Sequence, residues 1–181
     1  MTYPQAKRVA HAIEPYDVSW LEEPLPAEDV AGHRRLSEST SIPIAVGESM
    51  YAPGQFAEYV QAGAAGVLQV DAVRIGGITP WLKVAHMAKA CNLGVSPHFL
   101  MELHLSLVTA IRNGMYIEYI PQLTAITRST IRVVDGMAAV AVHDRDMTDG
   151  QIAGEVVNTF EYELMSHEII QLIHVSREVA A

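Results

Sequence analysis

The sequence predicts an α/β fold, a (β/α) barrel of the TIM type with parallel strands, on three observations. Short apolar runs alternate with longer segments of helical periodicity. A polar residue closes each of five successive apolar runs, and these closing residues are 26, 23, 27 and 20 residues apart, about one strand, one helix and two loops. Polar groups at the carboxyl ends of successive strands are typical of the active face of a barrel. The closing residues are Glu22, Glu48, Asp71, His98 and Glu118.

The elements are expected to begin with a helix and then to alternate. Apolar residues at helical spacing predict helices over 5–13, 28–39, 53–62, 78–92 and 103–111. Short apolar runs predict strands over 19–22, 42–46, 66–70, 93–96 and 115–119. Pro53 suits the first turn of its helix, and Gly63 is expected to cap the end of the same helix. No G-x-G-x-x-G loop follows any predicted strand, so a doubly wound nucleotide-binding fold is not expected.

The chain changes character after residue 130. Residues 131–134 and 137–142 are expected to form two strands joined by a turn at Asp135-Gly136. Residues 161–179 carry apolar side chains at helical spacing and predict an amphipathic helix. This helix is expected to pack on the body of the protein, or else to pair with another chain.

Composition and charge argue against several classes of partner. The 181 residues are 50% hydrophobic and carry a formal net charge of −9, which disfavours nucleic acid. No apolar run approaches the roughly 20 residues of a membrane helix, and the N-terminal residues lack the apolar core of a signal peptide. The single cysteine, Cys91, cannot form an internal disulfide, so a cytoplasmic protein is expected.

Two of the strand-end residues are candidate metal ligands. Glu22 and Glu48 would end neighbouring strands, and a pair of carboxylates there suits a hard divalent cation such as Mg²⁺. A second carboxylate, Glu23, directly follows Glu22. Because successive side chains of a strand face opposite ways, only one member of this pair is expected to be a ligand.

The remaining strand ends are candidates for acid/base chemistry. Neighbouring strands would bring Asp71 close to His98, and a carboxylate bonded to one imidazole nitrogen would leave the other as a general base. Glu118 would face the same opening. If Glu118 is buried, its pKa would rise and its neutral form could donate a hydrogen bond.

Several other polar residues are interpreted as structural. His33, His86 and His104 lie on predicted helices and are expected to be packing or surface residues. Arg74 follows Asp71 closely and is expected to tether a loop or a carboxylate. Glu102 could line the opening beyond His98, but an exposed position fits it equally well.

Five blocks of the sequence together resemble the mandelate racemase and muconate lactonizing enzyme branch of the enolase superfamily. The blocks are Trp20-Leu21-Glu22-Glu23-Pro24, Val46-Gly47-Glu48, Val70-Asp71-Ala72-Val73-Arg74-Ile75-Gly76-Gly77-Ile78-Thr79, Ser96-Pro97-His98 and Ile117-Glu118-Tyr119. The resemblance covers residues 3–142. It implies that Glu22 and Glu48 are two of three Mg²⁺ ligands and that Asp71 and His98 form the base pair. It also implies that Glu118 hydrogen-bonds a carboxylate oxygen of an enolic intermediate.

The activity implied by the resemblance is removal of the α-proton of a carboxylate or sugar-acid substrate, as in an acid-sugar dehydratase or racemase. Members of this branch also carry an α+β capping domain, first barrel strands with a Lys-x-Lys motif, and an Asp ligand, and none of these is found in this sequence. We therefore expect a partial barrel over residues 1–130 and a poorly matched C-terminal unit over 131–181. Such a chain should bind Mg²⁺ weakly and show little activity alone unless a partner chain completes it.

Two other classes of function stay open. The edges of a partial barrel could pair with another copy or another chain, which would make the protein a non-catalytic assembly module, and a homo-oligomer is expected in either case. An unrelated barrel lyase or aldolase fits less well, because no lysine ends a predicted strand to form a Schiff base. The sequence names neither the substrate nor the choice between racemisation and dehydration.

Overall fold

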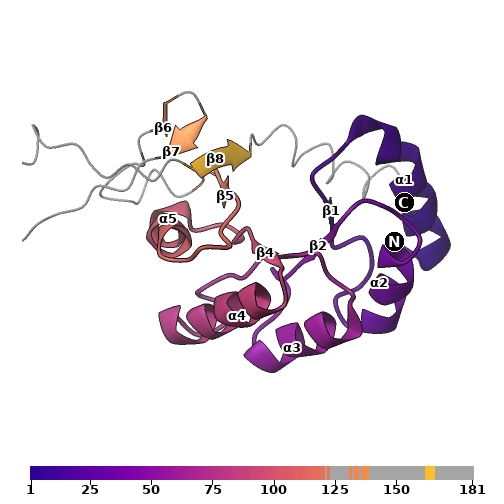
Figure 1. The fold of residues 1–181 in the computed structure, drawn as a ribbon, viewed down its shortest axis with the longest axis horizontal. Helices are drawn as coiled ribbons and strands as arrows, with labels where there is room; N and C mark the ends of the chain where they lie inside the picture. The colour runs from indigo at the N-terminus through magenta and orange to yellow at the C-terminus, as the bar shows by residue number, and fades with distance from the viewer. Residues whose placement is uncertain (121, 123–130, 132, 135, 139–161, 166–181) are drawn as a thin grey trace, which may run out of the picture.

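A computed structural model describes residues 1–120, 122, 131, 133–134, 136–138 and 162–165. The predicted parallel barrel segment is confirmed, because four strands form one parallel sheet in sequential order. These strands are β1 (Leu21–Glu22), β2 (Ile44–Val46), β3 (Val67–Leu68) and β4 (Gly94–Val95). Figure 1 shows that they follow an arc, with the helices along its outer side. Sequential parallel strands separated by helices define a (β/α) barrel segment.

The helices begin and end close to the predicted positions. They are α1 (Tyr3–Ile13), α2 (Val30–Ser37), α3 (Pro53–Ala62), α4 (Ile78–Ala90) and α5 (Met101–Thr109), and a 3-10 turn, η1 (Glu14–Tyr16), follows α1. The side chain of Asp29 caps α2 by accepting the Gly32 N–H at 2.8 Å. Pro53 is the first residue of α3, and Gly63 ends this helix in the left-handed region at φ +66°, as predicted.

The sheet separates two apolar layers, because alternate side chains point to opposite faces. On the outer face Leu21, Val46 and Val95 join the main core beneath the helices. The inner face carries a smaller cluster built from Trp20, Ala45 and Val67, with Met115 and Tyr116 packed against it. Glu22 is two residues beyond Trp20, and Gln69 is two beyond Val67, so strand alternation directs both polar side chains inward.

The next strand, β5 (Ile117–Glu118), continues the parallel arrangement beyond β4. A parallel bridge joins Val95 to Gly114, and β5 then pairs in parallel with β8 (Tyr162–Met165). The predicted hairpin is present as β6 (Val133–Val134) antiparallel to β7 (Met137–Ala138). Residues 139–142, the remainder of its predicted second strand, lie outside the described residues.

The predicted helix over 161–179 is wrong at its start. Residues 162–165 form β8, which lies between β5 and β7 and pairs with both. The apolar pattern of a short segment does not distinguish a strand from a helix, and here the backbone groups of two strands offer hydrogen-bond partners. The rest of the predicted helix lies outside the described residues.

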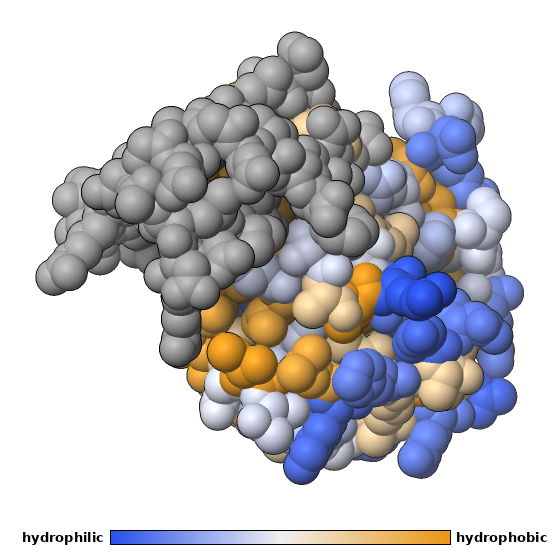
Figure 2. Space-filling view, turned by 60° about the vertical axis from the view of Figure 1, so that its left-hand side comes forward, coloured by the Kyte–Doolittle hydropathy of each residue, from blue (hydrophilic) through white to orange (hydrophobic). Residues whose placement is uncertain are grey.

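The described surface is divided by polarity. In the view of Figure 2, hydrophobic side chains gather on one part of the face and hydrophilic ones cover the other. The large hydrophobic side chains that stay exposed in the described part are Tyr16, Tyr51, Val73, Ile78 and Val133. No helix among the described residues has the length and apolar character needed to cross a membrane.

Candidate active site

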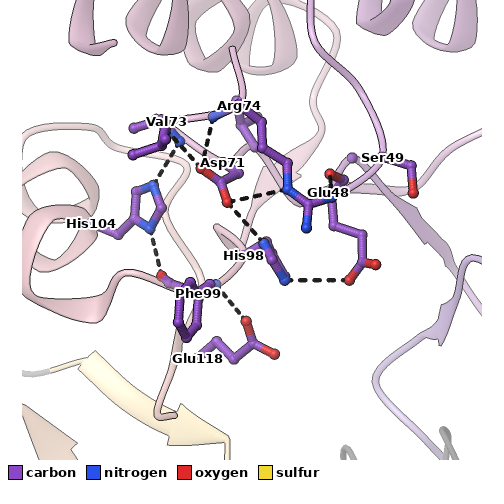
Figure 3. A network of polar contacts seen from close by, with 12 residues as sticks. Glu48, Ser49, Asp71, Val73, Arg74, His98, Phe99, His104 and Glu118 are labelled. Carbon is purple, nitrogen blue, oxygen red and sulfur yellow. Dashed lines mark hydrogen bonds and ion pairs between the residues drawn. The ribbon is translucent and has the colours of Figure 1, made fainter. Parts of the chain in front are cut away.

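The structure brings Glu48, Asp71 and His98 into direct contact (Figure 3). Each comes from the loop that follows a parallel strand, so all three lie at the carboxyl-end edge of the sheet. The two other predicted site residues, Glu22 and Glu118, end β1 and β5 and are joined to the same edge through intermediate residues.

Asp71 and His98 form a hydrogen-bonded pair in which Asp71 is buried and the His98 side chain is 15% exposed. Nδ1 of His98 lies 3.0 Å from Oδ2 of Asp71. The other oxygen of Asp71, Oδ1, accepts the backbone N–H groups of Val73 at 2.7 Å and Arg74 at 3.1 Å. An ionised carboxylate only accepts hydrogen bonds, so the His98 Nδ1 carries the proton and Nε2 is left as the basic nitrogen.

The charges of the pair are set by burial and by neighbours acting in opposite directions. Burial by itself raises the pKa of Asp71, but the His98 hydrogen bond and the two backbone N–H groups lower that pKa below its ordinary value. Burial by itself lowers the pKa of His98. The Asp71 hydrogen bond and the charges of Glu118 and Glu48 outweigh burial and raise the His98 pKa. The result is an ionised carboxylate hydrogen-bonded to an imidazole of raised pKa.

Glu22 and Glu23 point to different places, as strand alternation predicts. Glu22 is half-buried, and its Oε2 accepts the side-chain N–H of Gln69 at 2.7 Å. Glu23 is 5% exposed and turns toward the loop after β2. Its Oε1 accepts the N–H of Gly47 at 3.2 Å, and its Oε2 accepts the hydroxyl of Ser49 at 2.8 Å. Glu23 therefore holds the loop that carries Glu48, while Glu22 faces the interior.

Gly47 lets this loop pass close to the neighbouring strand. Its φ is +150°, and a Cβ added there would lie 2.6 Å from the backbone oxygen of Gln69. Only glycine fits both the conformation and the space. Glu48 follows at once, and its Oε2 lies 3.4 Å from Nε2 of His98. The candidate ligand therefore stands next to Nε2 of the candidate base, the ring nitrogen that Asp71 does not bind.

Arg74 links the Glu48 loop to the base pair, as its predicted tethering role requires. Its Nη1 donates a hydrogen bond to the backbone oxygen of Glu48, and its Nε lies 3.8 Å from Oδ2 of Asp71. The side chain is 35% exposed, so this charge is partly screened by water. Arg74 thus connects the ends of β2 and β3 rather than entering the opening as a reacting group.

Glu118 is held next to His98 through the backbone. Its Oε2 accepts the N–H of Phe99, the residue after His98, at 2.5 Å. Burial raises the pKa of Glu118, and the negative charges of Glu22 and Glu48 raise it further, although the Phe99 N–H and His98 act in the opposite direction. The raised pKa is the condition under which Glu118 can act as a neutral donor.

The other histidines differ in their surroundings. His33 is buried between α2 and α3, where Nδ1 contacts the Tyr59 hydroxyl at 3.0 Å, and His86 is exposed on α4. Both agree with the packing or surface roles predicted for them. His104 is also buried, but it contacts the backbone beside both members of the base pair. Its position, six residues beyond His98 at the start of the next helix, is the sequence feature that could have indicated this.

Glu22 and Glu48 are the residues that would hold a metal ion. Both are half-buried oxygen donors at the ends of adjacent parallel strands, and Mg²⁺ is commonly bound by one or two carboxylates while it keeps several waters. Within the described residues, no group of three or more His, Cys, Asp or Glu side chains is arranged to hold a metal. The donor set therefore fits Mg²⁺ in its chemistry and provides few protein ligands.

Together, the fold and this edge define a class of protein. The chain is a parallel (β/α)-barrel segment with a hydrogen-bonded Asp–His pair, the candidate base, and two candidate metal carboxylates on the carboxyl ends of its strands. Residues 1–145 match the family described as enolase C-terminal domain-like, and the chain belongs to that family. Its structural neighbours include members of the mandelate racemase and muconate lactonizing enzyme branch.

Two curated relatives act on acid sugars. L-talarate/galactarate dehydratase of Salmonella typhimurium is 33% identical over 131 residues, which are 72% of this chain and 33% of the relative. D-galactonate dehydratase of Ralstonia nicotianae is 41% identical over 95 residues, which are 52% of this chain and 25% of the relative. The chain therefore spans about a quarter to a third of the length of these relatives.

Solved structures show the same fold. L-talarate dehydratase from Polaromonas sp. JS666, complexed with Mg and L-glucarate, matches with a TM-score of 0.73 and 37% identity over 76% of this chain and 38% of that one. An enolase from Bradyrhizobium, complexed with magnesium and mandelic acid, matches with a TM-score of 0.72 and 34% identity over 75% of this chain and 38% of that one. Magnesium is thus present in structures of this family.

Proposed function

We propose that this chain carries the proton-abstracting part of an acid-sugar dehydratase site, in which the Asp71–His98 pair removes the α-proton of a sugar acid. The observation that carries the proposal is the 3.0 Å contact between His98 Nδ1 and Asp71 Oδ2, with His98 Nε2 next to Glu48. The dehydratase relatives support dehydration over racemisation.

In the proposed reaction, His98 Nε2 takes up the α-proton of the substrate. The electron pair left on the α-carbon forms an enolic intermediate, and the hydroxyl on the neighbouring carbon then leaves as water. The imidazolium of His98 is available to return a proton to that hydroxyl. The resulting enol rearranges to a 2-keto acid, so atoms and charge balance without an oxidant.

Asp71 and Glu118 would assist His98 in different ways. Asp71 keeps the proton on Nδ1 and raises the basicity of the ring. Glu118, whose pKa is raised chiefly by burial, would donate a hydrogen bond to the carboxylate oxygen that gains charge in the enolic state. When bound at Glu22 and Glu48, Mg²⁺ would stabilise negative charge on the substrate carboxylate.

The chain alone should work slowly. β1 is the edge strand of the described four-stranded sheet, so Glu22 has no further strand end beside it there to supply another carboxylate. Two carboxylates are few ligands for Mg²⁺, and weak metal binding leaves the enolic charge poorly stabilised. We propose that a further polypeptide segment, outside the described sheet, completes the site in the active form.

The proposal is tested by following the α-proton of sugar acids by NMR in D₂O with Mg²⁺. The substrates to compare are aldarates and aldonates, including galactarate, L-talarate and D-galactonate. The wild-type chain should exchange or eliminate the α-proton of at least one of them. His98→Asn should lower that rate by a factor of about 10² or more. His86→Asn, on the exposed side of α4, is the matched control and should leave the rate unchanged.

Each alternative outcome has a defined meaning. If the wild-type chain leaves every α-proton in place, the proposed function is wrong. Exchange that persists in His98→Asn would remove His98 from the role of base. Turnover on the order of 1–10³ s⁻¹, the ordinary range for enzymes, would contradict slow activity of the chain alone. Exchange without formation of a 2-keto acid would point to racemisation instead of dehydration.

A further inference from the structure

His104 is a buried histidine whose two ring nitrogens are both used. It lies near the start of α5 and has 0% of its surface exposed. Nε2 accepts the backbone N–H of Ala72 at 3.0 Å, and Nδ1 lies 2.7 Å from the backbone oxygen of Phe99. Because a backbone N–H only donates and a carbonyl only accepts, the ring must carry its proton on Nδ1 and be neutral. Burial lowers the pKa of His104, which is consistent with a neutral ring.

The two backbone groups bound by His104 are the immediate neighbours of the base pair. Ala72 follows Asp71, and Phe99 follows His98. The imidazole of His104 therefore spans the gap between the loop after β3 and the loop after β4, as Figure 3 shows. A planar ring that makes one hydrogen bond to each loop fixes the distance between the two loops. It thereby fixes the distance between Asp71, which precedes Ala72, and His98, which precedes Phe99.

The loop that carries His98 needs such support. Phe99 and Leu100 adopt φ values of +56° and +37°, in the left-handed region that residues with bulky side chains avoid. Such conformations persist only where surrounding contacts enforce them. Here the N–H of Phe99 is bound by Glu118, and its carbonyl is bound by His104. Loss of the His104 contact would free one side of this turn.

The support extends to the other side of Asp71 through Trp81 of α4. The rings of Trp81 and His104 stack, with centroids 6.2 Å apart and an interplanar angle of 26°. The Trp81 indole N–H donates to the backbone oxygen of Val70 at 3.0 Å. The peptide groups before and after Asp71 are therefore each anchored by a buried aromatic ring.

We propose that His104 is a positioning residue that sets the Asp71–His98 contact by bridging the backbone of Ala72 and Phe99. The proposal rests on the proposed function in treating Asp71 and His98 as the base pair. The dependence of the Asp71–His98 contact on the His104 bridge can be measured without any substrate or metal. His104 does not touch the reacting atoms; it acts through the two loops.

The experiment follows the Nδ1–H proton of His98 by NMR in ¹⁵N-labelled protein at one fixed pH, without metal or substrate. His104→Asn can keep a donor for the Phe99 oxygen, His104→Gln can keep an acceptor for the Ala72 N–H, and His104→Leu keeps neither. Far-UV circular dichroism checks the fold of each variant. The matched control is His86→Gln on the exposed side of α4.

In the wild type, the His98 Nδ1–H should exchange slowly with water because it is held by Asp71. Exchange should become at least about fivefold faster in the Asn and Gln variants, and faster again in the Leu variant. The control should match the wild type. An effect that follows the number of retained hydrogen bonds, and not the size of the side chain, distinguishes positioning from packing.

Three results would overturn the proposal. The first is unchanged exchange of the His98 Nδ1–H in folded His104→Gln and His104→Leu. The second is unfolding of all three variants, which would make His104 a structural residue. The third is the absence of a slowly exchanging His98 proton in the wild type. Failure of the dehydratase assay would leave this experiment unaffected, because no turnover is measured.

Discussion

Oδ2 of Asp71 lies 3.0 Å from Nδ1 of His98, although the two residues are 27 positions apart in the chain. The contact joins the ends of two adjacent parallel strands, β3 and β4. It orients the imidazole so that Nε2 faces the Glu48 carboxylate, 3.4 Å away. The candidate base and a candidate metal ligand therefore occupy one edge of the sheet.

Replacement of Asp71 by Asn should impair the base without unfolding the chain. The amide has the shape of the carboxylate but lacks its charge, so the pKa of the imidazole falls. The amide can also donate a hydrogen bond to Nδ1, so the proton is no longer held on that nitrogen. We expect α-proton exchange to fall by a factor of about 10² to 10⁴, as measured by NMR in D₂O. Asp17→Asn is the matched control, because Asp17 is exposed and its φ of +51° suits asparagine. A rate within a factor of about two of wild type would contradict the role of Asp71.

Replacement of Glu118 by Gln should change stability in a pH-dependent way. The folded-state pKa of Glu118 is raised by burial. A group of this kind contributes stability below its unfolded pKa and loses that contribution as the pH rises through its folded pKa. At pH 7 the unfolded chain carries an ionised Glu118, so folding must either bury that charge or take up a proton, and the neutral amide of glutamine avoids both costs. The variant should melt roughly 2 °C or more above wild type at pH 7.

The difference in melting temperature should shrink as the pH falls to about 4, just below the ordinary glutamate pKa of about 4.3. Thermal unfolding followed by circular dichroism at both pH values measures this. The control is Glu58→Gln on the exposed face of α3, for which equal melting temperatures at pH 7 are expected. A Glu118→Gln variant less stable than wild type at pH 7 would refute the prediction.

Replacement of Gly47 by Ala should destabilise the fold at the site. The added Cβ would lie 2.6 Å from the Gln69 backbone oxygen, and a φ of +150° is unfavourable for alanine. We expect a loss of about 2–4 kcal/mol in the free energy of unfolding, measured by urea titration. Gly54→Ala in α3 is the matched control, because no atom lies within 4 Å of its added Cβ. The control should be neutral or stabilising by up to about 1 kcal/mol, and equal effects at both positions would show the steric explanation to be wrong.

Magnesium should stabilise the chain through Glu22 and Glu48. Mg²⁺ at about ten times its dissociation constant contributes about 1.4 kcal/mol, which raises the melting temperature by roughly 3–6 °C. Glu22→Gln and Glu48→Gln should each remove most of this increase in a thermal-shift titration. Glu58→Gln should retain it. An increase of the same size in all three variants would mean that the cation binds elsewhere.

The order of elements and the strand-end residues were predictable from the sequence because both depend on local patterns. Apolar periodicity separates α3 from β2, and Pro53 and Gly63 mark the ends of α3 through backbone preferences that need no tertiary contact. The spacing of Asp71 and His98 corresponds to one crossover, which brings parallel strand ends together. The helix predicted from residue 161 failed at residues 162–165 because pairing with β5 and β7 overrides a short helical pattern.

Other features were decided only by the tertiary structure. Alternation leaves one of Glu22 and Glu23 facing inward, but the sequence does not show that Glu23 binds the Gly47–Ser49 backbone or that Gln69 binds Glu22. The role of His104 likewise depends on two loops that meet only when β3 and β4 pair. Local preference determines which residues end a strand, because it acts between neighbours along the chain. Which of those residues touch is determined by strand pairing and packing. The contacts of His98 with Asp71 and of Gln69 with Glu22, for example, join positions 27 and 47 residues apart, and such positions meet only when parallel strands pair across crossovers.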